Sequence, residues 1–223
     1  MEQAIMNNLN FPILSILIFL PVAGAALLLL INRSNENLIK WLSLIVSTAA
    51  FIISIPLFTE FNKSTHLMQF TEKHAWIPSL NINYHLGIDG ISVLFVLLST
   101  LVTILCVLIS WNSIKTKAKE FYISILIMEG AMIGVFCALD FMLFYLFWEA
   151  MLIPMYLLIG VWGGPNRIYA AVKFFLFTLV GSVLMLVGII VLYYQAGGTF
   201  SILELMTKTY PYKLQLWLFW AFF

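Results

Sequence analysis

Apolar residues along this chain gather into runs long enough to cross a bilayer, separated by short polar connections. A spanning helix needs about 20 predominantly apolar residues. The first three runs predict transmembrane helices over residues 11–31, 41–58 and 91–110. The next run, residues 121–162, is interrupted only by single acidic residues. As one helix it would be about 63 Å long, twice the hydrocarbon thickness, so it must fold back on itself.

The best place for that turn is Ala138-Leu139-Asp140, because Asp140 can cap the start of the following helix. A sixth span is predicted over residues 168–195, before two glycines. A last apolar run begins at Leu214 and covers only about 15 Å as a helix, half a bilayer. We therefore expect this chain to be a fragment of a longer protein. The predicted fold class is an all-α membrane protein with six transmembrane helices plus the start of a seventh.

The longest polar connection, residues 59–90, contains one ordered pattern. Apolar and polar residues alternate from position 79 to position 88, which predicts a short strand on the outer surface of the membrane. Asp89 follows as a predicted N-cap of the third span. His66, His74 and His85 share this region, but their spacing fits no metal motif, and we expect all three to be solvated.

Composition supports a membrane protein. Hydrophobic residues make up 63% of the 223 residues, charged residues make up 9%, and the mean hydropathy is +1.03. A soluble domain carries about 25% charged residues. The net charge of +1 and the lack of a long basic cluster give no indication of nucleic-acid binding. Cys106 and Cys137 each lie in an apolar run without a second ligand, which favours packing over a disulfide or a metal site.

Basic residues predict the orientation of the chain. Most of the eleven lysines and arginines fall in or beside the short connections on one side, namely Arg33, Lys40, Lys115, Lys117, Lys119, Arg167 and Lys173. The others lie on the opposite side, namely Lys63, Lys73, Lys208 and Lys213. By the positive-inside rule the short basic connections face the cytoplasm or the mitochondrial matrix, and the N-terminus lies outside.

The strongest candidate for chemistry is Glu149, in the middle of the predicted fifth span. Placing an ionisable side chain near the bilayer midplane costs roughly 2.5–3.5 kcal/mol even on lenient insertion scales. Such residues normally mark an ion path or a proton relay and have a partner elsewhere in the protein. The alternative is a glutamate that is hydrogen-bonded for packing alone.

Three further residues are weaker candidates. Glu129 is also central in its span. It either serves helix packing alone or forms part of a hydrated axis through the membrane. Lys173 lies about five residues into the sixth span, where it either snorkels to the surface or forms a basic site at a proton input. Pro154 predicts a kink that either gives Glu149 access to water or serves packing only. We find no phosphate loop, CxxC pair or haem-type histidine pattern, and we expect no cofactor and no metal.

An ordered set of motifs carries a family resemblance. They are Trp76-Ile-Pro78, Ile82-Asn-Tyr-His-Leu-Gly-Ile-Asp-Gly-Ile-Ser92, Gly134-Val-Phe136, Ala138-Leu-Asp140, Phe147-Trp-Glu-Ala-Met-Leu-Ile-Pro-Met-Tyr156, Trp162-Gly163 and Lys173-Phe-Phe175. Together they resemble subunit M of bacterial NADH:quinone oxidoreductase (respiratory complex I), the counterpart of mitochondrial subunit 4, over essentially the whole chain. The residues after Glu149 favour subunit M over its sister subunits and over multisubunit sodium/proton antiporters.

The resemblance implies an antiporter-like fold with two inverted five-helix repeats, each containing a broken helix. Residues 1–120 would form an N-terminal three-helix segment with the outer loop, and residues 121–223 an incomplete first repeat, truncated in its broken helix. Glu149 matches the family's essential carboxylate. The lysine with which the family pairs that carboxylate would lie just past Phe223.

The same resemblance implies a proton-translocating subunit of a respiratory-chain translocase. NADH, FMN, iron–sulfur clusters and quinone would bind other subunits, leaving no redox active site in this chain. Its partners would be other membrane-arm subunits and the lipid of the bacterial inner or mitochondrial inner membrane. Two alternatives stay open: a subunit of a multisubunit cation/proton antiporter or of a membrane-bound hydrogenase arm, and a membrane scaffold that transports nothing.

Overall fold

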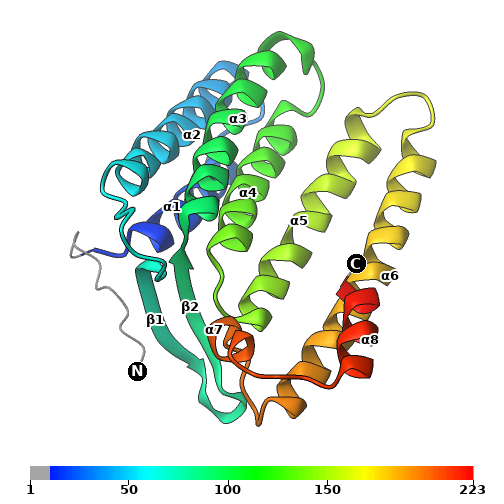
Figure 1. Cartoon of the computed structure of the whole chain (residues 1–223). Coiled ribbons are helices and arrows are strands. Elements are labelled where there is room, and N and C mark those ends of the chain that lie inside the picture. Colours follow the sequence, from blue (N-terminus) through cyan, green and yellow to red (C-terminus); the bar gives the residue numbers. More distant parts are fainter. Residues whose placement is uncertain (1–10, 223) are drawn as a thin grey trace.

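The computed structural model describes residues 11–222, and six long helices dominate this part of the chain (Figure 1). They are α1 (Ile13–Leu30), α2 (Glu36–Thr59), α3 (Gly90–Ser113), α4 (Ala118–Cys137), α5 (Phe141–Trp162) and α6 (Arg167–Gln195). Each is long and apolar enough to span a membrane. Two short helices follow, α7 (Ile202–Met206) and α8 (Tyr212–Phe222). The six predicted spans are confirmed, and the predicted seventh run is helical as α8.

Successive long helices run in opposite directions, so the connections alternate between two ends of the molecule (Figure 1). Connections 31–35, 114–117 and 163–166 share one end, which we call the basic end. The opposite end, which we call the hairpin end, carries the β-hairpin, connection 138–140 and the segment around α7. The grouping of basic residues expected from the sequence is therefore present in space.

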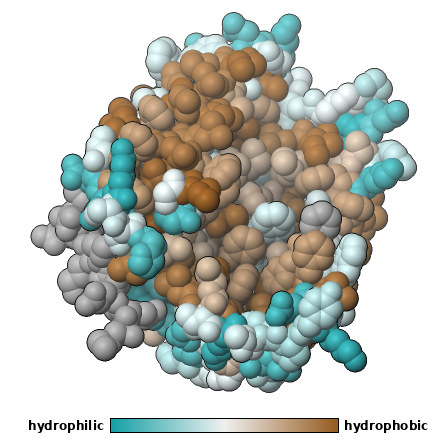
Figure 2. All heavy atoms as spheres, viewed as in Figure 1, coloured by the Kyte–Doolittle hydropathy of each residue, from teal (hydrophilic) through white to brown (hydrophobic). Residues whose placement is uncertain are grey.

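Helix α4 lies at the centre of the fold, packed against α1, α2, α3 and α5. Helix α6 is peripheral: it packs on α5 and, in its C-terminal part around Gly188 and Leu192, on α8. Apolar side chains cover the middle of the face in Figure 2, and polar side chains gather toward the two ends. That distribution fits a protein surrounded by hydrocarbon at mid-height and by water at both ends.

The predicted strand is present as β2 (Ile82–Ile88), and it pairs with a second strand that the sequence did not predict. This second strand, β1 (Gln69–Ile77), runs antiparallel to β2, and a short 3₁₀ helix, η1 (Pro78–Leu80), joins them. The sequence of β1 lacks a clear period of two, and its pairing with β2 is irregular at two points. Its strand structure therefore depends on pairing with β2.

The expectation that all three histidines are solvated is wrong for His85. His66 and His74 are exposed, but His85 is only 5% exposed. The physical reason is that β2 has a neighbour along both of its edges. It pairs with β1 on one edge, and on the other the backbone carbonyl of His85 accepts a hydrogen bond of 2.8 Å from the amide of Leu139, in the connection between α4 and α5.

A buried carboxylate fixes the hairpin to the helices. Glu72 of β1 accepts a hydrogen bond of 2.8 Å from the amide of Leu14, and it also accepts from the amide and the hydroxyl of Ser15 at the start of α1. The Ser15 hydroxyl lies 2.8 Å from that of Tyr84 on β2. An anion at a helix N-terminus satisfies free amides and interacts favourably with the helix dipole. Both strands are thereby held against α1.

Asp140 starts α5, as predicted. Its carboxylate accepts hydrogen bonds from the amides of Met142 at 2.9 Å and Leu143 at 3.3 Å, and from Asn83 of β2 at 3.0 Å. The same connection forms isolated β-bridges to β2 and to Ser201. Thus the helix that carries Glu149 is anchored at its first residue to the hairpin and to the segment before α7. Asp89 caps α3 in the same way, through the amides of Ile91 and Ser92.

Candidate functional site

Glu149 lies roughly 12 Å along α5 from its first residue, in a helix about 33 Å long. Its side chain is half-buried within the described chain. Carboxylate oxygen Oε1 is buried, and no hydrogen-bond partner is present for it among the described residues. Leaving such an oxygen unpaired costs about 1–3 kcal/mol, which makes an unpaired carboxylate a place to look for function.

Glu149 borders a cavity of about 280 Å³ between the hairpin and α5. The hairpin contributes Trp76, Ile77 and Ile82, and α5 contributes Met142, Tyr145, Leu146 and Glu149. The lining is almost wholly apolar apart from the carboxyl and the phenol. Because Asp140 anchors the start of α5 to β2, the position of Glu149 relative to the hairpin is fixed. The Glu149 side chain faces the hairpin end of the molecule.

Tyr145 is a second polar group at this cavity, one helical turn before Glu149 and on the same face of α5. Sequence reasoning missed Tyr145, although its spacing of four residues from Glu149 was a usable signal.

Glu129 occupies a different environment in α4. It is 0% exposed, and neither carboxylate oxygen has a hydrogen-bond partner among the described residues. The next residue, Gly130, is packed so closely on α1 that an added Cβ would lie 2.6 Å from the carbonyl oxygen of Ile18. Tyr122, two turns toward the basic end, has a buried hydroxyl that also lacks a partner in this part of the chain. The bundle therefore holds two unsatisfied polar groups on one helix.

The structure does not join the two glutamates directly. Helices α4 and α5 pack against each other, and Gly134 allows the close approach: a Cβ there would lie 2.5 Å from the ring of Phe147. However, since both oxygens of Glu129 are unpaired, no hydrogen bond links its carboxyl to Glu149 among residues 11–222.

Lys173 is not brought to Glu149 either. It is exposed, its Nζ lies 5.8 Å from the ring centroid of Tyr169, and it lines a surface groove of α6 together with Leu176 and Phe177. The residues of α6 that are buried toward the fold include Ala171 and Ser182, on another face. Pro154 is buried, and α5 continues through it without a break.

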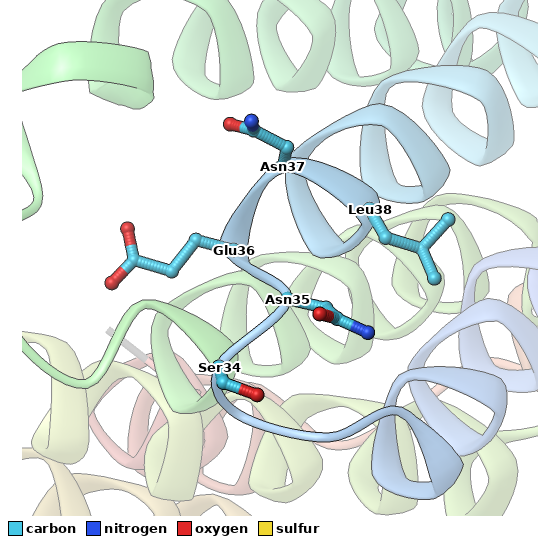
Figure 3. Close-up of a pocket in the computed structure, with 5 residues that line it drawn as sticks. All are labelled: Ser34, Asn35, Glu36, Asn37 and Leu38. Carbon is cyan, nitrogen blue, oxygen red and sulfur yellow. The ribbon is translucent and has the colours of Figure 1, made fainter.

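The basic end carries two ion pairs among the described residues. Arg33 contacts Glu120 at 2.8 Å, and Lys40 contacts Glu36 at 3.7 Å. A hollow of about 510 Å³ at the start of α2 is lined by residues 34–38. The side chains of Glu36 and Leu38 point in opposite directions there, so they do not converge on a ligand (Figure 3). The described residues contain no cluster of three potential metal ligands.

Comparison with known proteins gives a consistent picture. Residues 138–223 match the family model described as NADH:quinone oxidoreductase/Mrp antiporter, TM. The chain is 47% identical over 204 residues to NADH-quinone oxidoreductase subunit M of Rhodobacter capsulatus, covering 90% of this chain and 39% of the relative. It is 44% identical over 211 residues to NADH-ubiquinone oxidoreductase chain 4 of Arabidopsis thaliana, covering 94% of this chain and 42% of that relative. The chain thus spans less than half the length of these relatives.

Solved structures show the same fold. A chain of respiratory complex I from Thermus thermophilus with bound NADH superposes with a TM-score of 0.79 at 29% identity, covering 93% of this chain and 42% of that one. A chain of the Mrp complex from Dietzia sp. DQ12-45-1b superposes with a TM-score of 0.74 at 16% identity, covering 87% of this chain and 21% of that one. The second similarity shows the fold alone.

Proposed function

We propose, from the premise that this chain is homologous over nearly its whole length to subunit M of NADH:quinone oxidoreductase, that it acts in proton translocation within the membrane arm of that complex. In this proposal NADH oxidation and quinone reduction take place in other subunits, which hold NADH, FMN, iron–sulfur clusters and quinone. The chain contributes residues 1–120 as an N-terminal helical segment and residues 121–223 as part of an antiporter-like repeat. Its place is the bacterial inner membrane or the mitochondrial inner membrane.

The observation that carries the proposal is the Glu149 carboxyl itself. It lies near the middle of a spanning helix, has a buried oxygen without a partner, and borders a cavity. Intramembrane carboxylates of this kind mark proton relays in pumps and transporters.

The other candidates have supporting roles in the proposal. Glu129 supplies a second titratable group in the neighbouring helix, and Lys173 supplies a basic site at the basic end, where protons enter. Pro154 lacks a backbone N–H, so the carbonyl of Ala150 loses its helical partner and can bind water one residue from Glu149.

A subunit of a cation/proton antiporter is the second candidate, favoured by the fold similarity to the Mrp complex. The complex I assignment is better supported, because identity to subunit M reaches 47% whereas the Mrp similarity rests on 16%. The two differ in the transported ion: the antiporter would show proton movement that requires sodium or potassium, and complex I would show proton movement that requires quinone reduction.

The test is Glu149→Gln in the complete protein, assembled in its complex in membrane vesicles. Glutamine keeps the shape and much of the hydrogen bonding but cannot carry the proton, so proton translocation and coupled quinone reduction should collapse while assembly persists. Glu149→Asp should be milder. The matched control is Glu60→Gln, because Glu60 is exposed at the end of α2. Near-normal translocation in Glu149→Gln would overturn the proposal.

A further inference from the structure

A second cavity adjoins the one that Glu149 borders, and the proposed function does not use it. Its volume is about 390 Å³, and its lining is almost wholly apolar. The two cavities share Trp76 of the hairpin and Leu146 of α5. The lining of the second cavity includes Phe19 of α1, His74 and Trp76 of the hairpin, and Leu143, Leu146 and Phe147 of α5. The hairpin thus covers an apolar space between α1 and α5, which we call the hairpin groove.

The hairpin groove lies in the part of the spanning region that is nearest to the hairpin. Phe19 follows the first residue of α1 by six positions, Phe147 follows the first residue of α5 by six positions, and both helices start at the hairpin end (Figure 1). At 1.5 Å per residue, both side chains lie roughly 9 Å from the starts of their helices. One leaflet of a bilayer contributes about 15 Å of hydrocarbon. The groove is therefore at the depth of the acyl chains of the leaflet on the hairpin side.

The shape of the groove favours a narrow occupant. Phe19 is 52% exposed, Trp76 is 49% exposed and Leu146 is 48% exposed, so the groove opens to the surroundings of the helices. An α-helix with its side chains is about 10–12 Å across, and one turn takes up roughly 400–600 Å³. That is more than the groove holds, so a neighbouring helix would cover it without entering it. An acyl chain is a single file of carbon atoms and is narrow enough to enter.

Two hydrogen-bond donors line the hairpin side of the groove. The imidazole of His74 and the indole N–H of Trp76 form no hydrogen bond with any residue among 11–222. A histidine has at least one N–H to donate in either protonation state, and an indole only donates. Lys73 adds a positive charge beside His74, and residues 73–88 contain no acidic side chain. Tryptophan is also typical of the level of lipid headgroups. The donors and the charge are complementary to a phosphate.

We propose that the hairpin groove binds an anionic phospholipid of the leaflet on the hairpin side, with one acyl chain along Phe19 and Leu146 and the phosphate at His74 and Trp76. Lipid tails are as apolar as the groove, so burial of the chain contributes little by itself. The preference for one lipid over another therefore comes from the headgroup. This inference does not rest on proton transfer by Glu149.

The experiment uses the complete protein assembled in its complex, in phosphatidylcholine vesicles that contain a phospholipid with a photoreactive diazirine in its acyl chain. One preparation carries the diazirine on phosphatidylglycerol, which is anionic, and the other carries it on phosphatidylcholine, which is zwitterionic. Peptide mass spectrometry measures the label on residues 13–20 and 141–147 relative to the label on α3, whose exposed face includes Ile91 and Ile109. We expect this ratio to be about fivefold higher with phosphatidylglycerol, the factor that corresponds to ~1 kcal/mol for one basic side chain near a membrane surface.

Two variants test the headgroup site. His74→Gln keeps a hydrogen-bonding side chain but removes the positive charge, and Trp76→Phe keeps an aromatic ring but removes the N–H. Each should lower the preference for phosphatidylglycerol. The matched control is His66→Gln, because His66 is an exposed histidine of the same loop and does not line the groove, and it should keep the preference.

The comparison of the two lipids on the unmodified protein decides even if a variant does not assemble. Equal labelling by both lipids overturns the inference, as does an unchanged preference in both His74→Gln and Trp76→Phe. A groove that takes up no label from either lipid also overturns it, because protein would then cover the groove.

Discussion

The molecule places two central glutamates in opposite kinds of surroundings. Helices α1 to α4 form a bundle in which Glu129 is completely covered. Helices α5 and α6 form a more open pair in which Glu149 is half-buried and borders a cavity. Both residues are carboxylic acids near the middle of a spanning helix, so composition and depth do not distinguish them.

The difference arises from how closely the helices approach. In the bundle, Gly130 brings α4 against the backbone of α1, which leaves no room beside Glu129 on that side. In the pair, large apolar side chains of α6 such as Phe177 and Val180 are exposed, and the hairpin stands over α5 with space beneath it. A proton carrier needs a titratable group and a route to it. Both places supply a titratable carboxyl, and Glu149 in addition borders a cavity.

The largest effect should come from adding a bulky side chain where α4 of the bundle packs against α5 of the pair. Gly134→Leu places a side chain where even a Cβ would lie 2.5 Å from the ring of Phe147, so α4 and α5 must move apart. Overpacking typically costs 1–3 kcal/mol, and here the contact includes an aromatic ring between two helices. We expect little or no assembled complex in membranes, measured by native gel electrophoresis.

The control for that change is Gly181→Leu on α6, where an added Cβ meets no atom within 4 Å. The complex should assemble normally in this variant, because the added side chain meets none of the described atoms. Normal assembly of Gly134→Leu would show that α4 and α5 separate easily, and the contrast between bundle and pair would lose its physical basis.

A smaller effect should separate the two glutamates by stability. Glu129→Leu removes two unpaired buried oxygens and adds apolar packing, so the melting temperature of the assembled protein should stay equal or rise. Glu149→Leu should not show this gain, because part of the Glu149 side chain is already accessible. Thermal scans of both variants test the comparison. Clear destabilisation by Glu129→Leu would mean that the bundle contains a partner for this carboxyl.

The smallest expected effect concerns the caps that start one helix in each region. Burial raises the pKa of Asp140 despite its hydrogen bonds to backbone amides. A folded-state pKa above the unfolded value means that the folded protein binds more protons than the unfolded chain. The contribution of Asp140 to the free energy of unfolding is therefore lost as the pH rises from the unfolded-state pKa through the folded-state pKa. Asp140→Asn should remove that decline from the stability profile.

The pKa of Asp89 is shifted in the opposite direction. Burial raises the pKa of Asp89, but hydrogen bonds from Ser92 and Ile91 outweigh burial, and the pKa lies below its ordinary value. Its stabilisation is therefore present above the ordinary value and is lost as the pH falls through the folded-state pKa. Denaturation at several pH values should show opposite changes of slope for Asp140→Asn and Asp89→Asn. The same change in both variants would contradict the difference between the caps.

Local properties of the sequence were sufficient for the presence of the six helices and for two of their caps, although α2 starts at Glu36, five residues before the predicted span. Length and apolarity determine a spanning segment by themselves, because the backbone must be hydrogen-bonded internally wherever no water is available. The caps Asp89 and Asp140 followed from residue type and position, since an aspartate before a helix bonds amides only two and three residues away. The predicted turn at Ala138-Leu139-Asp140 was correct for the same reason.

The contacts between distant segments were decided only by the tertiary structure. The sequence alone placed Glu149 in the middle of a membrane helix and identified it as the strongest candidate for a functional residue. It could not show that β1 pairs with β2, that His85 is buried, or that Lys173 lies on the exposed face of α6. Those facts depend on how segments far apart in the chain pack, and an apolar helix carries little information about which of its faces will meet a neighbour, since most of its faces are equally soluble in lipid.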